Sequence, residues 1–301
     1  MKLLITGAWQ ASPEELDELR GLGHTVLLQP QEKEPLAFPP EEIDGVICNG
    51  LFLYHPIESF TRLRYIQLTS AGYDRIPMDY VKARNIEIHN ARGVYSVPMA
   101  EHALAGVLAL YRRLPVFFRQ QQDRFWNKIR NLEELTGKSV LIVGCGNIGT
   151  ECAGRFAALG CEIHGIDLVA RPPESPFASL EDAGRLNGRL KGADILILTL
   201  PLTAETRNFM DAARLALLKD HAIVVNISRG AIIHQKALES ELKSGRLRAV
   251  LDVFEDEPLE TASPLWGLDN TVVTPHISFV GGQNACRLNS VIMDNLRNVI
   301  S

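Results

Sequence analysis

The chain has 301 residues and a mass of 33.4 kDa, which is long for one ordinary domain and fits two packed domains or one large α/β unit. Hydrophobic residues make up 46% and charged residues 22%, so the chain is too apolar for intrinsic disorder. Its formal net charge of -5, from 31 Lys+Arg against 36 Asp+Glu, argues against general binding to nucleic acid or to an anionic membrane.

Hydropathy and cysteine usage exclude further classes of protein. The longest nearly unbroken apolar stretch, Ala103 to Tyr111, is about half of what a bilayer crossing needs. The N-terminal apolar run is too short for a signal peptide and suits a first buried strand. None of the five cysteines belongs to a C-x-x-C pair: Cys48, Cys145, Cys152, Cys161 and Cys286. We therefore expect a cytoplasmic protein with free thiols and no metal site.

The first third of the chain alternates between strand-like and helix-like segments. Short apolar strands are expected at residues 3–5, 24–28, 45–48 and 65–68. Ser12 as N-cap and Pro13 at the first helical position predict a helix that ends near Gly21. Strands separated by helices favour a parallel sheet with right-handed crossovers.

The same alternation restarts after a long apolar helix expected at residues 97–114. Strands dense in Val, Ile and Leu are expected at residues 139–143, 162–166, 194–198, 222–227, 248–253 and 271–273. A last helix, at 281–300, is too short to form a domain and is expected to pack on the first sheet. The predicted fold class is α/β, with two Rossmann-like or flavodoxin-like parallel-sheet domains. The first is discontinuous (1–96 and 277–301) and the second spans 97–276.

A glycine motif follows the strand predicted at 139–143. It reads Gly144-Cys145-Gly146-Asn147-Ile148-Gly149 and leads into a helix-compatible stretch. Gly144 allows a tight turn, Gly146 lets backbone N–H groups approach a pyrophosphate, and Gly149 permits close packing of helix on strand. The helix N-terminus adds partial positive charge. In this context the motif predicts a dinucleotide site rather than an ordinary glycine-rich turn.

An acidic residue follows the next strand. Asp167 stands 18 residues after the last glycine of the motif, where it would accept hydrogen bonds from ribose hydroxyls and repel a 2′-phosphate. This favours NAD(H) as cofactor. Arg171 lies close by and could accommodate a 2′-phosphate, so NADP(H) remains possible.

Polar side chains follow three successive strands of the second domain. Arg229 follows residues 222–227, and His276 follows 271–273. Asp252 lies at the end of the strand at 248–253, and Glu257 follows that strand. Ligands of open parallel sheets bind at the carboxyl ends of the strands, so these four side chains should converge. Arginine binds a carboxylate in two parallel hydrogen bonds, and a carboxylate beside an imidazole favours the protonated, proton-donating form. Each residue alone could equally be a solvated or capped side chain, but together they suit reduction of a carbonyl beside a carboxylate.

The chain resembles the D-isomer-specific 2-hydroxyacid dehydrogenase family, which includes phosphoglycerate, glyoxylate/hydroxypyruvate and D-lactate enzymes. The resemblance covers about residues 69 to 278 and rests on seven stretches: 70–74, 99–104, 144–149, 200–206, 226–230, 251–259 and 274–278. It implies that Arg229 binds the substrate, that His276 is the acid/base and that Glu257 pairs with it. It also implies that amides of Ala71 and Gly72 bind the substrate.

The resemblance further implies a set of cofactor contacts: Gly144, Gly146, Asn147, Ile148, Gly149, Asp167, Leu200, Pro201, Thr206, Ser228, Asp252 and His276. Asp252 would hydrogen-bond the nicotinamide carboxamide. The implied function is an NAD(H)-dependent reductase of small 2-oxo acids, with hydride exchanged between nicotinamide and C2 of a 2-oxo or D-2-hydroxy acid. Glu257 stands where formate dehydrogenases carry glutamine, which argues against formate. A different class also stays open, an NADH-binding sensor or corepressor-like protein with little turnover. The substrate itself is left open.

One basic and aromatic stretch, residues 112–130, has some character of a nucleic-acid patch. Helical spacing explains it more simply, and family analogy places it at the contact between two subunits, so we expect a homodimer and no nucleic-acid partner. The other histidines show no metal-ligand spacing and are interpreted as structural: His24, His55, His89, His102, His164, His221 and His234.

Overall fold

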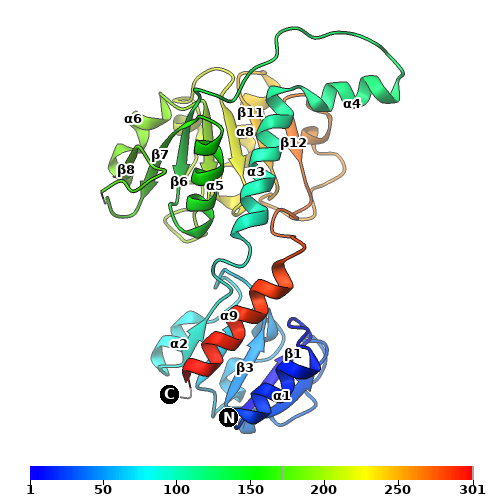
Figure 1. The fold of residues 1–301 in the computed structure, drawn as a ribbon, viewed down its shortest axis with the longest axis vertical. Coiled ribbons are helices and arrows are strands. Elements are labelled where there is room, and N and C mark those ends of the chain that lie inside the picture. Colours follow the sequence, from blue (N-terminus) through cyan, green and yellow to red (C-terminus); the bar gives the residue numbers. More distant parts are fainter. Residues whose placement is uncertain (171, 300–301) are drawn as a thin grey trace. The chain divides into compact units, whose positions relative to one another are not determined.

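The computed structural model describes residues 1–170 and 172–299. It divides into two compact units, one of residues 1–95 with 281–301 and the other of residues 96–280 (Figure 1). The first unit therefore combines N-terminal and C-terminal segments, as the sequence predicted. The sequence placed the domain boundaries after residues 96 and 276, whereas in the structure the chain passes from one unit to the other after residues 95 and 280.

The first unit is built on a five-stranded parallel sheet. Its strand order is β2-β1-β3-β4-β5. The strands are β1 (Lys2–Thr6), β2 (Thr25–Gln29), β3 (Gly45–Cys48), β4 (Tyr65–Leu68) and β5 (Glu87–His89). The helices are α1 (Pro13–Gly21), α2 (Met78–Ala83) and α9 (Asn284–Val299). The Ser12 side chain accepts from the backbone N–H of Glu15, and the Glu15 side chain accepts from that of Ser12, so the predicted N-cap is a capping box.

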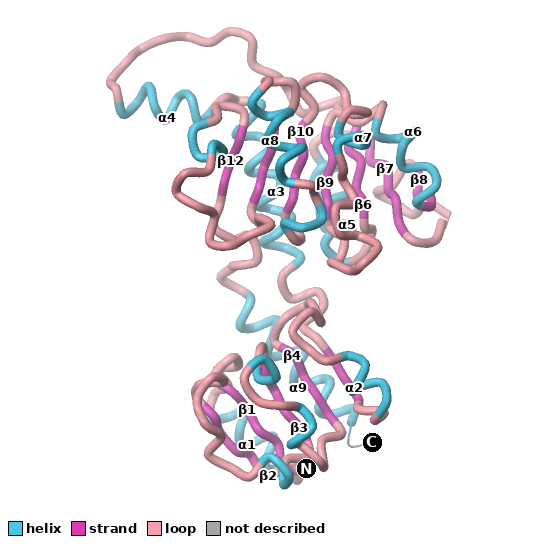
Figure 2. The backbone as a smooth tube through the Cα atoms, turned by 180° about the vertical axis from the view of Figure 1, so that it is seen from behind, coloured by secondary structure: helices cyan, strands magenta, loops and turns pink. Residues whose placement is uncertain are grey.

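Alternate residues of the central strands face opposite sides of this sheet. Leu3 and Ile5 pack with α1 and with Ile292 and Leu296 of α9, whereas Leu4 lies in a separate core on the side of α2. Figures 1 and 2 show α1 and α9 on one face and α2 on the other. The last helix thus packs on the first sheet, as expected.

The second unit contains a seven-stranded parallel sheet, in the order β12-β11-β10-β9-β6-β7-β8. Its strands are β6 (Ser139–Val143), β7 (Glu162–Asp167), β8 (Ser179–Asp182), β9 (Ile195–Leu198), β10 (Ile223–Asn226), β11 (Arg248–Leu251) and β12 (Thr271–Val273). Its helices are α3 (Ser96–Tyr111), α4 (Leu114–Gln122), α5 (Asn147–Ala158), α6 (Leu186–Leu190), α7 (Ala212–Leu215) and α8 (Gln235–Lys243). Helices α3 and α5 lie on one face and α6, α7 and α8 on the other (Figures 1 and 2). Both faces are covered, which explains why the central strands are continuous apolar runs.

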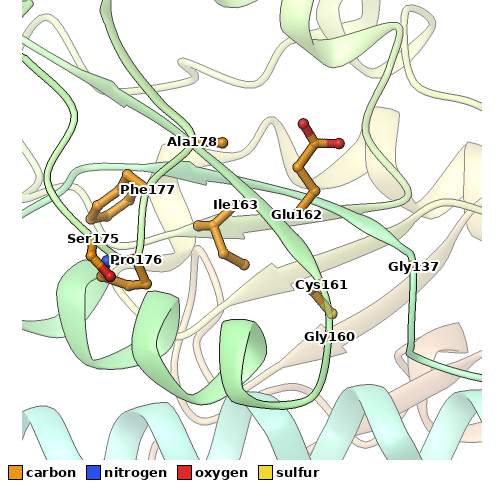
Figure 3. Close-up of a pocket in the computed structure, with 9 residues that line it drawn as sticks. All are labelled: Gly137, Gly160, Cys161, Glu162, Ile163, Ser175, Pro176, Phe177 and Ala178. Carbon is orange, nitrogen blue, oxygen red and sulfur yellow. The ribbon is translucent and has the colours of Figure 1, made fainter.

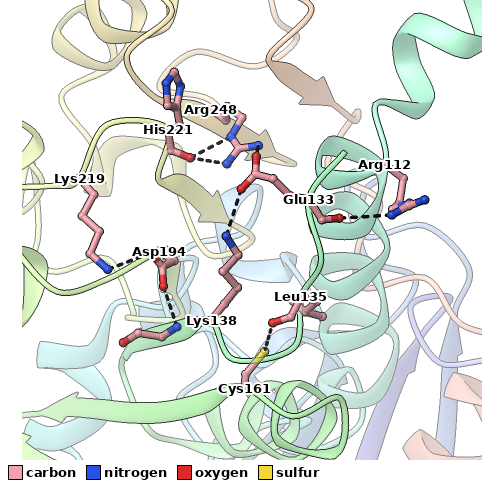
Figure 4. Close-up of polar contacts among 10 residues, drawn as sticks. Arg112, Glu133, Leu135, Lys138, Cys161, Asp194, Lys219, His221 and Arg248 are labelled. Atoms are coloured by element: carbon pink, nitrogen blue, oxygen red, sulfur yellow. Dashed lines mark hydrogen bonds and ion pairs between the residues drawn. The ribbon is translucent and has the colours of Figure 1, made fainter. Parts of the chain in front are cut away.

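A network of charged side chains lies at the amino ends of these strands (Figure 4). The Glu133 carboxylate accepts hydrogen bonds from the side chains of Arg248, at 2.6 Å, and Lys138, at 3.1 Å. Asp194 accepts from the Ser139 backbone N–H and from Lys219, both at 2.9 Å. Burial acts to raise the pKa of the Asp194 carboxyl, but these hydrogen bonds and the neighbouring lysine charges outweigh it and hold the pKa below its ordinary value.

The described residues contain neither a candidate membrane-spanning helix nor a candidate metal-binding cluster. No helix there is long and apolar enough to cross a membrane. Likewise, no group of three or more His, Cys, Asp or Glu side chains in residues 1–170 and 172–299 is arranged to hold a metal ion.

Candidate active site

The predicted site residues of the second unit follow the carboxyl ends of its strands. The glycine motif follows β6, Asp167 ends β7, and Leu200 follows β9. Arg229 and His276 follow β10 and β12. Because all seven strands are parallel, these segments lie at one edge of the sheet. Strand β6 is the point from which the chain proceeds outward in both directions, which is the usual position of a ligand crevice.

Each glycine of the motif has a distinct environment. Gly144 has φ +97°, and a Cβ there would lie 2.9 Å from the carbonyl carbon of Thr199. A Cβ on Gly149 would lie 2.2 Å from the Gly144 carbonyl oxygen, so this glycine lets α5 pack on the turn. By contrast, a Cβ on Gly146 would meet no atom within 4 Å. Gly146 therefore leaves open space beside the loop, which fits a pyrophosphate approaching the backbone.

Helix α5 begins directly at this open space. Gly146 is its N-cap, and Asn147 and Ile148 form the first two helical positions. The backbone N–H groups of a first helical turn have no partner within the helix, and they carry the positive end of its dipole. Residues 146–148 thus form a helix N-terminus of the kind at which phosphate groups commonly bind.

The Asp167 carboxylate lies beside the same turn. Its Oδ2 accepts from the Cys145 backbone N–H at 3.2 Å, and its Oδ1 accepts from that of Leu168 at 2.8 Å. The carboxylate is half-buried, so the lone pairs left over are accessible to ribose hydroxyls. Arg171, the residue that would favour NADP(H), lies outside the described residues.

The loop after β9 adjoins the glycine turn because β9 is the neighbour of β6. The Thr199 hydroxyl donates to the Gly144 carbonyl at 2.5 Å. Farther along, the Thr206 hydroxyl donates to the Pro201 carbonyl at 2.7 Å and accepts from the backbone N–H of Thr203 at 2.7 Å. Leu200, Pro201 and Thr206 therefore belong to one internally bonded loop. Sequence reasoning did not single out Thr199, which ties this loop to the glycine motif.

Arg229 stands on a turn that Asn226 organises. The buried Asn226 amide donates to the Arg229 carbonyl at 3.0 Å and accepts from the Ser228 hydroxyl at 2.8 Å. Gly230 follows, and a Cβ there would lie 1.9 Å from the carbonyl carbon of Phe254. The Arg229 turn is thus packed directly against the backbone of the Glu257 loop.

His276 and Glu257 form a hydrogen-bonded pair. His276 Nδ1 lies 2.7 Å from Glu257 Oε2, and Glu257 Oε1 accepts from the Phe254 backbone N–H at 3.0 Å. Since an ionised carboxylate only accepts, the proton of this bond lies on Nδ1. The pair is about one third exposed, with side-chain accessibilities of 38% for His276 and 35% for Glu257. Nε2 of the ring is therefore the nitrogen that Glu257 does not bind.

Asp252 differs from the other predicted contacts because its side chain is fully buried, with 0% exposure. Its Oδ1 accepts from the Thr274 hydroxyl at 2.6 Å and from the Ile277 backbone N–H at 2.8 Å. Its Oδ2 accepts from the Ser278 backbone N–H at 2.8 Å. The carboxylate thus holds the segment that carries His276, and its contact with a cofactor carboxamide stays a prediction.

In the first unit, Ala71 and Gly72 follow β4. Asn90 Nδ2 donates to the Ala71 carbonyl at 2.6 Å, and the Ser70 hydroxyl donates to the Gly72 carbonyl at 3.1 Å. Among the described residues, neither backbone N–H donates to another group, so both are available to a ligand. Tyr95 donates to the carbonyl of Thr69, and burial raises the pKa of its phenol.

Glu32, which sequence reasoning did not single out, closes the carboxyl ends of β1 and β3. Its Oε1 accepts from the Thr6 hydroxyl at 2.8 Å and from the Asn49 backbone N–H at 2.6 Å. Its Oε2 accepts from the backbone N–H of Gly50 at 2.7 Å. No motif links residue 32 to residues 6 and 49, so sequence reasoning could not indicate these contacts.

A cavity of about 650 Å³ lies elsewhere in the second unit (Figure 3). It is lined by Cys161, Glu162 and Phe177, among others. Its lining residues Glu162 and Ile163 begin β7, whereas Asp167 ends that strand. This cavity does not belong to the candidate active site.

The comparison with protein families decides the assignment. The model described as "D-isomer specific 2-hydroxyacid dehydrogenase, NAD binding domain" matches residues 104–278, more than half of the chain. The chain belongs to this dehydrogenase family. The matched residues include the glycine motif, the Arg229 turn and His276.

Known relatives agree with this membership. The chain is 31% identical to a D-3-phosphoglycerate dehydrogenase of Archaeoglobus fulgidus over 99% of its own length and 57% of that enzyme. It is 34% identical to a hydroxypyruvate reductase of Thermotoga maritima over 73% of the chain and 72% of the relative. A solved D-isomer specific 2-hydroxyacid dehydrogenase from Xanthobacter autotrophicus Py2, in complex with NADPH and MES, is 28% identical, with a TM-score of 0.79 over 99% of this chain and 94% of that one. The chain spans about half the length, 42–57%, of the phosphoglycerate dehydrogenases it matches.

Proposed function

We propose that this dehydrogenase reduces small 2-oxo acids with NADH and works reversibly on D-2-hydroxy acids. The observation that supports this most directly is the His276–Glu257 pair at 2.7 Å, at the same sheet edge as a dinucleotide loop. When bound, the nicotinamide would supply or accept the hydride at C2 of the substrate.

The chain's own groups would handle the proton and the substrate charge. Glu257 holds Nδ1–H and stabilises the imidazolium, while Nε2 gives a proton to the carbonyl oxygen or takes it from the hydroxyl. Arg229 would bind the substrate carboxylate and polarise the adjacent carbonyl. The amides of Ala71 and Gly72 would bind the substrate carboxylate as well.

The donor set at the carboxyl edge suits a dinucleotide. Backbone N–H groups of residues 146–148 would hold the pyrophosphate, and Asp167 would bind the adenosine ribose and disfavour a 2′-phosphate. The remaining contacts would come from Leu200, Pro201, Thr206, Ser228 and Asp252. We propose NAD(H) over NADP(H) on the charge of Asp167, and comparing the two cofactors tests this choice.

Initial-rate measurements would test the proposal. NADH and NADPH oxidation is followed with glyoxylate, hydroxypyruvate, hydroxypyruvate phosphate, pyruvate, 2-oxoisocaproate and phenylpyruvate. Turnover of at least one substrate is expected. The substitution His276→Gln should lower kcat by roughly 100-fold with NADH affinity retained. A variant near the wild-type rate would overturn the acid/base role. Tight NADH binding without turnover on any substrate would instead favour an NADH sensor.

We also propose that the dehydrogenase forms a homodimer through the segment 112–130. This segment exposes large aromatic side chains, with Phe125 61% and Trp126 90% accessible, beside a hollow of about 770 Å³. Exposed aromatic clusters of this kind are typical of protein interfaces. Light scattering should give a dimer mass for the wild type and a smaller mass for Trp126→Glu. Leu168→Glu, at a side chain 84% exposed elsewhere in the same unit, is the matched control and should remain dimeric.

A further inference from the structure

The backbone of His276 adopts an unusual conformation. Its φ is +51°, in the left-handed region that residues with a Cβ rarely adopt. Such a conformation persists only where the surrounding structure determines it. The groups that impose it therefore also determine where the imidazole points.

Those groups converge on Asp252. Strands β11 and β12 are paired in parallel with Leu251 opposite Val273, so Asp252 and Thr274 leave the sheet side by side. The His276 backbone N–H donates to the Asp252 carbonyl at 2.8 Å. The Asp252 carboxylate accepts from Thr274 on one side of His276 and from Ile277 and Ser278 on the other. The left-handed residue is thus bracketed by bonds to a single buried side chain.

A third residue extends this arrangement to helix α3, which lies across β11 and β12 in Figure 1. His102 Nε2 lies 3.1 Å from Thr274 Oγ1. Thr274 has one hydroxyl proton, and the ionised Asp252 only accepts, so the proton points at Asp252. The Thr274 oxygen must then accept, which makes His102 Nε2 the donor. The chain of bonds runs from His102 Nε2–H through the Thr274 hydroxyl to Asp252 Oδ1, and such chains strengthen each member.

We propose that His102 and Thr274 are positioning residues for His276. They act through Asp252: the hydroxyl of Thr274 and the imidazole of His102 fix the carboxylate, and the carboxylate fixes the left-handed turn that holds the His276 ring against Glu257. This inference rests on the proposed acid/base role of His276. It predicts that removing the chain of bonds lowers the rate of the proton-transfer step without removing any contact to substrate.

Thr274→Val tests this because it keeps the shape of the side chain and removes the hydroxyl. We expect kcat to fall roughly 10-fold, equivalent to about 1.4 kcal/mol in the barrier, with KM for the 2-oxo acid within about twofold of wild type. Thr274→Ser restores the hydroxyl and should recover most of the rate. Thr271→Val is the matched control, since Thr271 begins β12, the strand that Thr274 directly follows, and its buried hydroxyl has no hydrogen-bond partner among the described residues. Its kcat should equal that of the wild type.

His102 is tested by a pair of substitutions and by its tautomer. His102→Leu should lower kcat in the same way, and His102→Gln, which keeps a donor near the position of Nε2, should recover part of it. Long-range ¹H–¹⁵N NMR of the NADH-free protein, with His102→Gln for assignment, should show His102 protonated at Nε2. A tautomer protonated only at Nδ1 would overturn the proposal independently of activity.

The outcomes separate this inference from the proposed function. If the wild type turns over no 2-oxo acid, or His276→Gln keeps its rate, the proposed function fails and the positioning role fails with it. If those results hold but Thr274→Val has wild-type kcat, or Thr274→Ser is as slow as Thr274→Val, only the positioning role is refuted. A Thr274→Val loss that matches its loss of folded protein also refutes it, because a purely structural role would lower the yield and leave kcat per folded molecule unchanged.

Discussion

Two glycines of helix α5 should respond in opposite ways to the same substitution. An alanine Cβ at Gly149 would lie 2.2 Å from the Gly144 carbonyl oxygen and 3.2 Å from Ile142 Cγ2. Gly154 lies five residues farther along the helix, on its exposed face, and an alanine Cβ there would meet no atom within 4 Å. The pair therefore isolates the close approach of the helix to the glycine turn from the general effect of alanine in a helix.

The size of each effect follows from these contacts. An exposed alanine is about 1 kcal/mol better than glycine inside a helix, so Gly154→Ala should stabilise the protein by about that amount. Gly149→Ala must push the Gly144 carbonyl away by about 1 Å, and overpacking of this kind costs about 1–3 kcal/mol. The turn has little room to retreat, because Gly144 is itself at φ +97° against the backbone of Thr199. The gain from alanine in a helix is common to both variants, so they should differ by the overpacking cost alone, about 1–3 kcal/mol.

Thermal denaturation followed by circular dichroism, together with NADH titration by fluorescence, measures both consequences. At about 2–4 °C per kcal/mol, the Tm values of the variants should differ by roughly 2–12 °C, with Gly154→Ala the higher. Gly149→Ala should also bind NADH more weakly, since the displaced turn carries the phosphate-binding amides. A Gly149→Ala protein with wild-type Tm and NADH affinity would show that the turn is not closely packed on the helix and would refute this reasoning.

Three other substitutions or treatments test features outside the catalytic pair. Asp194→Asn should destabilise the protein by about 1–2 kcal/mol at pH 7, because it breaks a charged hydrogen bond to Lys219. The pKa of Asp194 is lower in the folded than in the unfolded protein, so its contribution to the free energy of unfolding is complete above the unfolded pKa and is lost as the pH falls through the folded pKa. In urea denaturation, the stabilities of wild type and variant should therefore converge below about pH 4. Glu32→Gln should cost about 1–3 kcal/mol in urea denaturation, as it weakens the clamp on two backbone amides, and Glu34→Gln, at an exposed position, should cost almost nothing. A thiol reagent at pH 7 should label the exposed Cys286 first in the native protein. Burial raises the thiol pKa to about 11 at Cys161 and to about 12 at Cys152, so these thiols should react slowly. Rapid labelling of several thiols would contradict the described burial.

Central strands that are buried on both faces were predicted well, and so was β12, an edge strand with the apolar sequence Thr-Val-Val. Residues 45–48, 65–68, 139–143 and 271–273 form strands with the predicted limits. The short edge strands β5 and β8 were not predicted, and they read Glu-Ile-His and Ser-Leu-Glu-Asp. An edge strand pairs on one side only and is more exposed, so its sequence carries little apolar signal. The pairing that creates such strands depends on the neighbouring strand rather than on their own residues.

The site shows a similar division between residues and their partners. Motifs and the positions of strand ends indicated Arg229, Glu257 and His276, because those signals are local in sequence. They did not indicate Asn226 or Phe254, whose role is to hold the turns through amide and backbone hydrogen bonds. These supporting contacts depend on which backbone groups face each other after folding, and no residue type or spacing encodes that.

Asp252 illustrates what the structure adds to a correctly chosen residue. The resemblance implied that its carboxylate faces a cofactor, yet the side chain is fully buried and accepts three hydrogen bonds from its own chain. Burying a carboxylate is costly unless its lone pairs are satisfied, so these donors are needed for folding before any ligand arrives. The same bonds force His276 into a conformation that would otherwise be unfavourable. Folding thus positions the imidazole before any ligand binds. A role in holding the His276 turn therefore accounts for an aspartate at this strand end as well as contact with a cofactor does.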